Sequence, residues 1–211
     1  MRFEDQRKLL VQELRQQGIR DEAVLAAFSK VPRELYVPPQ YKDYAYRNRP
    51  LPIGLEQTIS QPLMVAIMLE HLELKSEDLV LEIGTGSGYE CALLAEIAGE
   101  VCSVERLEEL SLTAQGVLKE AGYKNIFFRI GDGAQGWLKA YPPHKEFDKI
   151  IVSAGARQIP PRLQEQLKPG GILVVPVGAG DYQILTKVIR TENGYSVSEH
   201  GACAFVPLIS K

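Results

Sequence analysis

A glycine-rich loop after the apolar run Leu79–Ile83 is the first group of residues whose types and spacing suggest chemistry. The loop, Gly84-Thr85-Gly86-Ser87-Gly88, lets the backbone turn sharply and approach a ligand at the amino end of the next helix. A dinucleotide fingerprint needs a small residue where Tyr89 stands, and a phosphate loop needs a lysine after the glycines, so neither fits. Glu82, just before the loop, favours a cationic amino-acid group over a phosphate. The alternative is a plain glycine-rich connection with a solvated Glu82.

Two further acidic residues follow apolar runs. Glu105 lies about 20 residues beyond the glycine loop, where a carboxylate can accept both hydroxyls of a ribose. Asp132, within Gly131-Asp132-Gly133, could accept a hydrogen bond from an adenine amino group. Taken singly, Glu105 can be a solvated helix start and Asp132 an ordinary Asx-turn. Taken with the glycine loop, they indicate a site for a nucleoside joined to an amino acid, which is S-adenosylmethionine.

A third candidate is Ser60, in the segment Thr58-Ile59-Ser60-Gln61-Pro62. The pattern predicts a helix with Ser60 as its N-cap and Pro62 in its first turn. A helix N-terminus is also an anion site, so a hydroxyl there could orient a substrate carboxylate. The alternative is a purely structural cap, which is commonplace.

Short apolar runs alternate with helical periodicity through the middle of the chain, which predicts an α/β fold with a doubly wound, mainly parallel sheet and right-handed crossovers. Helices are expected in the first thirty residues, with Asp21 capping the second, and an antiparallel hairpin is expected around Glu192-Asn193-Gly194. We expect a single domain, residues 1–211, made of a helical and flap segment (1–60), a cofactor-binding core (61–180) and a hairpin (181–211). The predicted strands are 79–83, 101–105, 126–130, 147–152 and 172–177, the predicted helices between them are 89–98, 107–121 and 160–168, and the hairpin strands are 182–190 and 195–206.

The stretch Tyr36–Gln57 has no helical or strand period but is rich in tyrosine and proline. Such a stretch inside a compact domain is usually functional or disordered, and its aromatic content argues against disorder. We interpret it as a flap over the cofactor and a wall for the substrate; the alternative is that its tyrosines pack against the sheet edge.

Composition excludes several classes of protein. The chain has 211 residues, 24 Lys and Arg against 27 Asp and Glu, and 45% hydrophobic residues, so it is globular without a global basic footprint for nucleic acid. No apolar run is long enough for a membrane span, and the N-terminus lacks a signal peptide's apolar core. We therefore expect a cytoplasmic monomer with no nucleic-acid or membrane partner. We also expect no metal, because three cysteines (Cys91, Cys102 and Cys203) and three histidines (His71, His144 and His200) are too few and too scattered.

These motifs together are similar to those of the protein-L-isoaspartate O-methyltransferase family in its bacterial form. The likeness covers nearly the whole chain, and Thr58–Pro62 is its most specific segment. It implies methyl transfer from S-adenosyl-L-methionine, giving S-adenosyl-L-homocysteine, to the α-carboxyl of L-isoaspartyl residues in damaged proteins and peptides, which starts repair through a succinimide. It implies that Ser60 is the active-site hydroxyl. The residues expected around the cofactor are Ile59, Ser60, Glu82, Gly84, Thr85, Gly86, Ser87, Gly88, Glu105, Arg106, Gly131, Asp132 and Gly133.

Two other functions remain open at this point. A methyltransferase acting on a small molecule or RNA would share the glycine loop and both acidic residues, but it has no reason to carry Thr58–Pro62. A non-catalytic module would bind the cofactor and methylate nothing. An NAD-dependent oxidoreductase is disfavoured by Tyr89.

Overall fold

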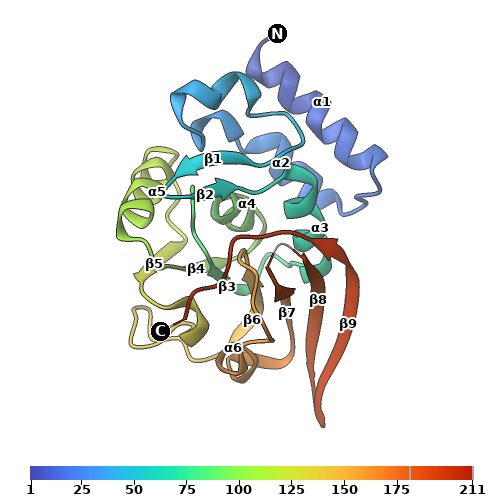
Figure 1. Cartoon of the computed structure of the whole chain (residues 1–211), viewed down its shortest axis with the longest axis vertical. Helices are drawn as coiled ribbons and strands as arrows, with labels where there is room; N and C mark the ends of the chain where they lie inside the picture. Colours follow the sequence, from blue (N-terminus) through green and yellow to red (C-terminus); the bar gives the residue numbers. More distant parts are fainter. Residues whose placement is uncertain (181, 211) are drawn as a thin grey trace.

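A twisted sheet forms the centre of the computed structural model, which describes residues 1–180 and 182–210 (Figure 1). Within these residues the sheet has seven strands in the order β5-β4-β3-β6-β7-β8-β9. Neighbouring strands from β5 to β7 pair in parallel, whereas β8 pairs antiparallel with β7 and with β9. The predicted fold class is thus confirmed. The strands are β3 (Leu79–Ile83), β4 (Glu100–Glu105), β5 (Ile126–Ile130), β6 (Phe147–Val152), β7 (Leu167–Ala179), β8 (Tyr182–Thr191) and β9 (Gly194–Cys203).

The central strands are buried on both faces, as their continuous apolar runs predict. Because side chains alternate along a strand, Val80 packs into one core and Leu81 into the other, and neither is exposed. The first core contains residues of α3 (Pro62–Leu72), α4 (Tyr89–Ile97) and the N-terminal helices. The second core contains Trp137, which lies between β5 and β6, and Leu163, which belongs to the short helix α6 (Pro161–Glu165). On the edge of the sheet, α5 (Glu108–Glu120) contacts β4 and β5.

The N-terminal segment forms two helices that pack on the first core. Helix α1 (Phe3–Gln16) buries Leu10 and Leu14, and α2 (Glu22–Lys30) begins after Asp21. The Asp21 side chain accepts hydrogen bonds from the Ala23 and Val24 amides, which confirms it as the N-cap.

The aromatic stretch that follows is folded, with short 3-10 helices at η1 (Arg33–Leu35) and η2 (Pro39–Tyr44). It continues into a β-hairpin of β1 (Leu51–Gly54) and β2 (Gln57–Ile59). Tyr36 and Tyr46 are buried, and their rings contact Tyr89 of α4 and Phe3 of α1 rather than the sheet edge. The hairpin lies over the glycine loop, because Ile53 Cδ1 is within 3.6 Å of where a Cβ on Gly86 would be.

Three predicted elements have bounds that differ from the structure by more than one residue. The helix predicted at 160–168 ends at Glu165, because Leu167 already pairs with Phe147 of β6 and Pro169 cannot continue a helix. Strand β7 therefore begins five residues before the predicted run 172–177. The terminal hairpin turns at Glu192-Asn193, where Thr191 pairs with Gly194, and its last strand ends at Cys203 rather than at 206. Residues 181 and 211, the ends of the predicted hairpin segment, lie outside the described residues. In the part that is described, the helices are too short or too polar to span a membrane.

Candidate active site

A cavity opens where β3, β4 and β6 end, which is the edge at which open α/β sheets bind ligands. It encloses about 910 Å³ of atom-free space, part of which is open to solvent. Most of the predicted site residues meet here: Ile59, Ser60, Gly84, Thr85, Gly86, Ser87, Glu105, Arg106 and Gly133 all line it. The other lining residues are Gln57, Thr58, Val65, Ile83, Tyr89, Glu90, Val104, Leu107, Leu110, Ser153, Ala154 and Val206–Ile209.

The glycine loop divides into a part that faces the cavity and a part that packs. Gly84 and Gly86 line the cavity with φ of +99° and +52°, conformations that favour glycine. Gly88, at the N-cap of α4, is not among the lining residues. A Cβ there would lie 3.0 Å from Leu118 Cδ1 and 3.2 Å from Ala114 Cβ. Gly88 therefore lets α4 pack closely on α5, and it contributes to the site through that packing.

Tyr89, the bulky residue that breaks the dinucleotide fingerprint, connects the loop to the N-terminal segment. It is 1% exposed, its ring packs edge-on against Phe28 at 6.0 Å and tilted against Tyr36 at 5.6 Å, and burial raises the pKa of its hydroxyl to about 12. The helix after the loop is thus held by aromatic packing where dinucleotide-binding proteins need a small residue.

Glu105 holds the backbone around the mouth of the site. Its Oε2 accepts a hydrogen bond from the Gly86 amide at 2.9 Å, and its Oε1 accepts from the amides of Arg106 and Leu107 at 2.7 and 3.0 Å. One carboxylate therefore joins the glycine loop to the residues that lead into α5. Because a carboxylate offers about four lone-pair sites, these three bonds leave Glu105 acceptor capacity toward the cavity that it lines.

Glu82 is fully buried and is not among the lining residues, so the predicted direct contact with a ligand's amino group is not what the geometry shows. Its Oε2 accepts a 2.5 Å hydrogen bond from Ser103 Oγ, which in turn lies 2.5 Å from Thr85 Oγ1 on the cavity wall. Among the described residues, Oε1 of Glu82 has no hydrogen-bond partner. Burial and the neighbouring Glu90 hold the pKa of Glu82 well above its usual range.

Glu90 is a lining residue that the sequence analysis missed. It is 8% exposed, and Ser153 Oγ donates a 2.5 Å hydrogen bond to its Oε1. Burial raises the pKa of Glu90 to about 7, against the lowering effect of the Ser153 hydroxyl. An acidic residue in the first turn of a helix looks like an ordinary dipole partner, so only its position two residues after the loop could have indicated the site.

Ser60 lies on the cavity wall, but it does not cap the following helix as predicted. The N-cap of α3 is Gln61, which makes no side-chain capping bond. The Leu63 amide instead donates to Oδ1 of Asn48 at 3.0 Å, so a side chain from before the β-hairpin caps the first turn. The Ser60 side chain is therefore not needed as a cap.

Arg33 supports Ser60 from inside the protein. Its side chain is fully buried, its Nη2 donates to the Ser60 carbonyl and its Nε donates to the Ala45 carbonyl, both at 2.8 Å. The guanidinium also lies 4.8 Å from the centre of the Tyr89 ring. Burial lowers the pKa of Arg33 to about 10, which leaves it charged at neutral pH. Arg33 thus fixes the backbone of Ser60 relative to the helix that begins at Tyr89.

The loop after β5, Gly131–Gly133, contributes fewer residues to the cavity than predicted. Gly133 lines the cavity, whereas Gly131 and Asp132 are not among the lining residues. Oδ1 of Asp132 accepts a 2.9 Å hydrogen bond from the Ala134 amide, which is the local turn named above as the alternative.

The segment Val206–Ile209 closes the cavity from the other end of the chain, and no sequence signal pointed to it. After β9 the chain runs back across the ends of the strands (Figure 1). Backbone bonds fix it there, from the Gly155 amide to the Val206 carbonyl and from the Leu208 amide to the Gly155 carbonyl, both at 2.8 Å. Residues far apart in the sequence, 57–60 and 206–209, therefore face one cavity.

The charges around the cavity favour a ligand with positive charge. Two buried acidic side chains, Glu90 and Glu105, line the cavity. Glu82 lies behind Thr85, and its raised pKa holds it toward the neutral form, so it adds little charge. Among the described lining residues the basic side chain is Arg106. Burial raises the pKa of Glu90, and a positively charged ligand beside it would favour the ionised form of its carboxyl. A sulfonium with an amino-acid end fits these residues, and a pyrophosphate does not.

Comparisons with known proteins agree with this geometry. The family model for protein-L-isoaspartate(D-aspartate) O-methyltransferase matches residues 5–211. The chain is 48% identical to the protein-L-isoaspartate O-methyltransferase of Dictyoglomus turgidum, over 98% of this chain and 92% of that one, and 49% identical to that of Petrotoga mobilis, over 100% and 99%. A crystal structure from Plasmodium falciparum, described as a protein-L-isoaspartate O-methyltransferase in complex with S-adenosyl-L-homocysteine, matches with a TM-score of 0.83 and 25% identity over 96% of this chain and 97% of that one. The chain therefore belongs to the protein-L-isoaspartate(D-aspartate) O-methyltransferase family.

Proposed function

We propose that this protein transfers a methyl group from S-adenosyl-L-methionine to the α-carboxyl of L-isoaspartyl residues in damaged proteins and peptides. Membership of the family supports both the reaction and the substrate class. The observation that carries the proposal is that Thr58, Ile59 and Ser60, from the segment Thr58–Pro62, line the same cavity as the glycine loop and Glu105. A substrate carboxyl group and the methyl donor can thus be held within one site.

The reaction needs few catalytic groups. S-adenosyl-L-methionine supplies a methyl group on a sulfonium, which leaves as a neutral thioether. A free α-carboxyl has a pKa near 3.5, so it is ionised at neutral pH and needs no general base. The protein's task is to hold a carboxylate oxygen in line with the methyl carbon and to keep water out, and such positioning can supply roughly 7–11 kcal/mol.

The lining residues suggest a division of roles. Ser60 holds one oxygen of the substrate carboxylate, while Arg33 fixes its backbone. The loop Gly84–Ser87 and Glu105 hold the cofactor, with Glu105 accepting from the ribose hydroxyls. Glu82 orients Thr85 on the cavity wall through Ser103. Ile59, Arg106 and Gly131–Gly133 complete the proposed cofactor contacts, with Asp132 beside the adenine.

The product of the reaction completes the proposed repair without further catalysis. The methyl ester carries a better leaving group than the free carboxylate, so the following backbone amide nitrogen can attack the ester carbonyl and release methanol, which forms a succinimide. The succinimide then hydrolyses partly to normal aspartate. We propose that residues 1–211 act as one methyltransferase domain, and that the protein is a cytoplasmic monomer with isoaspartyl proteins, not nucleic acid or membrane, as partners. Light scattering after size-exclusion chromatography measures the oligomeric state, and cell fractionation measures the location.

Methyl transfer to two matched peptides tests the proposal directly. The peptides are identical except for L-isoaspartyl or L-aspartyl at one position, and the donor is labelled S-adenosyl-L-methionine. We expect base-labile label on the isoaspartyl peptide alone. Label on neither peptide, with cofactor binding intact, would refute the proposed substrate but not the cofactor-binding fold. Label transferred to RNA or to metabolites, added in place of the peptides, would favour a methyltransferase with another substrate.

A further inference from the structure

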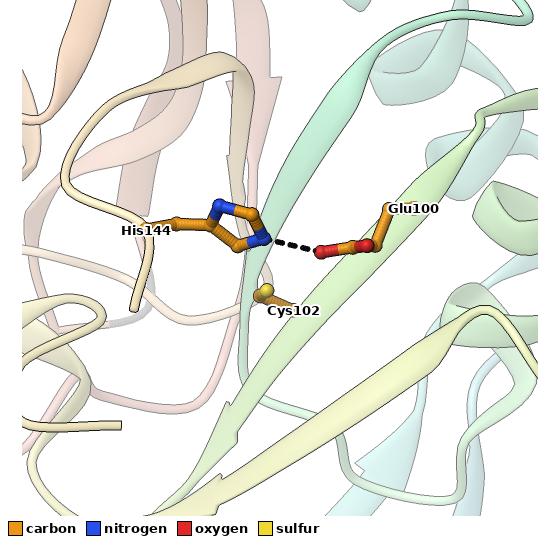
Figure 2. Close-up of side chains that lie close together, drawn as sticks. All are labelled: Glu100, Cys102 and His144. Atoms are coloured by element: carbon orange, nitrogen blue, oxygen red, sulfur yellow. Dashed lines mark hydrogen bonds and ion pairs between the residues drawn. The ribbon is translucent and has the colours of Figure 1, made fainter. Parts of the chain in front are cut away.

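Three metal-ligating side chains converge at the end of the sheet opposite to the cavity (Figure 2). They are Glu100 and Cys102 of β4 and His144 of the loop that precedes β6. One ligand atom from each lies within 4.8 Å of the other two, and His144 Nε2 is 2.5 Å from Glu100 Oε1. Glu100 begins β4 and Glu105, on the cavity, ends it, so this cluster is separate from the proposed active site.

The local fold explains why these residues meet. Glu100 and Cys102 are two residues apart on one strand, so their side chains point to the same face. His144 comes from a loop 42 residues later, and its ring packs edge-on against Phe147 at 6.2 Å. The imidazole is thereby held over the strand, with one ring nitrogen directed at Glu100 (Figure 2).

We propose that Glu100, Cys102 and His144 form a zinc-binding site, with water as the fourth ligand. One thiolate, one imidazole and one carboxylate are the donor types that Zn²⁺ prefers, whereas Ca²⁺ and Mg²⁺ take oxygen ligands. The thiolate and the carboxylate together carry two negative charges, which match the charge of the ion. On binding, Cys102 and the His144–Glu100 pair each give up any proton they hold to solvent, and no electrons are transferred.

Burial in the cluster suits such a site. Cys102 is fully buried, and burial and Glu100 raise the pKa of its thiol, so the thiol would lose its proton only when the ion binds. The side chains of Glu100 and His144 are 32% and 30% exposed. These two leave a path for the ion and a position for the water. In a tetrahedral zinc site, ligand atoms about 2.0–2.3 Å from the metal lie roughly 3.3–3.7 Å from one another. The His144–Glu100 contact must therefore open by about 1 Å, which the loop carrying His144 can provide.

The proposed consequence is structural. The ion would clamp the loop before β6 to the first residues of β4, across the intervening strand β3. The site is independent of methyl transfer, so its test does not depend on the identity of the methyl acceptor.

Metal titration of the reduced, metal-stripped protein tests the site. Co²⁺ is used as a spectroscopic probe, because a cobalt–thiolate bond gives a strong near-ultraviolet band, and Zn²⁺ affinity is measured by competition with a chromophoric chelator. We expect one equivalent of Co²⁺ to produce the thiolate band, and excess Zn²⁺ to abolish it. Cys102→Ser should remove the band, and His144→Ala and Glu100→Gln should each weaken Zn²⁺ binding at least tenfold.

Two matched variants separate this site from the rest of the chain. Cys203→Ser removes another buried thiol, and His200→Ala breaks the His71–His200 pair, whose ring centres are 4.0 Å apart. Both should leave the band and the Zn²⁺ affinity unchanged. The proposal is overturned if the wild-type protein gives no thiolate band, or if Zn²⁺ affinity is the same in His144→Ala as in the wild type. Because His144 and Glu100 are partly exposed, their variants keep the test valid even if Cys102→Ser fails to fold.

Discussion

Replacing Glu90 by glutamine should change how stability depends on pH. Burial raises the pKa of Glu90 to about 7 from its usual 4.5, so the folded protein holds a proton that the unfolded chain has already lost. Below pH 4.5 both states are protonated and the group has no effect. As pH rises from 4.5 to 7, ionisation of Glu90 in the unfolded chain lowers the free energy of unfolding progressively. Above pH 7 this loss of stability has reached its full size. A difference of about 2.5 pH units, at about 1.4 kcal/mol each, gives a ceiling of about 3.5 kcal/mol.

Glutamine removes this penalty while keeping the shape of the side chain. Its carbonyl can still accept the hydrogen bond from Ser153 Oγ. We therefore expect Glu90→Gln to be about as stable as the wild type at about pH 4 and more stable by up to about 3.5 kcal/mol at about pH 8. Urea unfolding of the cofactor-free proteins at several pH values measures the difference. Glu192→Gln, in the exposed turn between β8 and β9, is the matched control and should show no such dependence.

Glu90→Gln should also change the affinity for the charged methyl donor more than the affinity for the product. An ionised Glu90 attracts the sulfonium of S-adenosyl-L-methionine, and the thioether of S-adenosyl-L-homocysteine lacks that charge. At pH 8, Glu90→Gln should thus weaken the donor more than the product, as measured by calorimetry. Parallel stability profiles for variant and wild type from pH 5 to 8 would refute the reasoning, because they would show that Glu90 does not titrate differently in the two states.

Three more substitutions test separate parts of the structure. Ser60→Ala should lower kcat roughly 10- to 100-fold, the value of a hydrogen bond to a carboxylate, with cofactor affinity little changed; unchanged turnover would remove Ser60 from the mechanism. Glu56→Gly should stabilise the protein by about 1 kcal/mol in urea unfolding, because Glu56 has φ of +59° in the β1–β2 turn, and a loss of stability would contradict this. Gly133→Ala should cost about 1–3 kcal/mol, since its Cβ would lie 2.3 Å from Ile83 Cγ2, whereas Gly116→Ala, in open space on α5, should not destabilise; equal effects would contradict the packing argument.

The sequence predicts the central sheet well because its signal is local. The runs at Leu79–Ile83, Ile126–Ile130 and Phe147–Val152 appear as strands with the predicted bounds, since each is a short apolar run. The first and last are buried on both faces, whereas Ile126–Ile130, on the edge of the sheet, is only partly buried. The glycine loop and Glu105 reach the cavity for a related reason, because parallel strands end at one edge.

The rest of the site depends on contacts that no local pattern encodes. The cap of α3 comes from Asn48 rather than from the adjacent Ser60, through a hairpin whose packing decides which side chain reaches the helix. Glu90 resembles any glutamate in a first helical turn until its burial is known. His144 and Glu100 are 44 residues apart, so their contact depends on how the loop before β6 lies over the sheet.

Because Val206–Ile209 completes the wall of the cavity, the order of synthesis limits when the protein can bind its cofactor. The glycine loop, Glu105 and Gly133 leave the ribosome well before residues 206–209. At about 5–20 residues per second, the interval between Gly133 and Ile209 is on the order of 4–15 s. During that time one wall of the cavity is missing, so Glu90 and Glu105 are more exposed than in the complete protein. A ligand that needs the complete wall can therefore bind only after residues 206–209 have been synthesised.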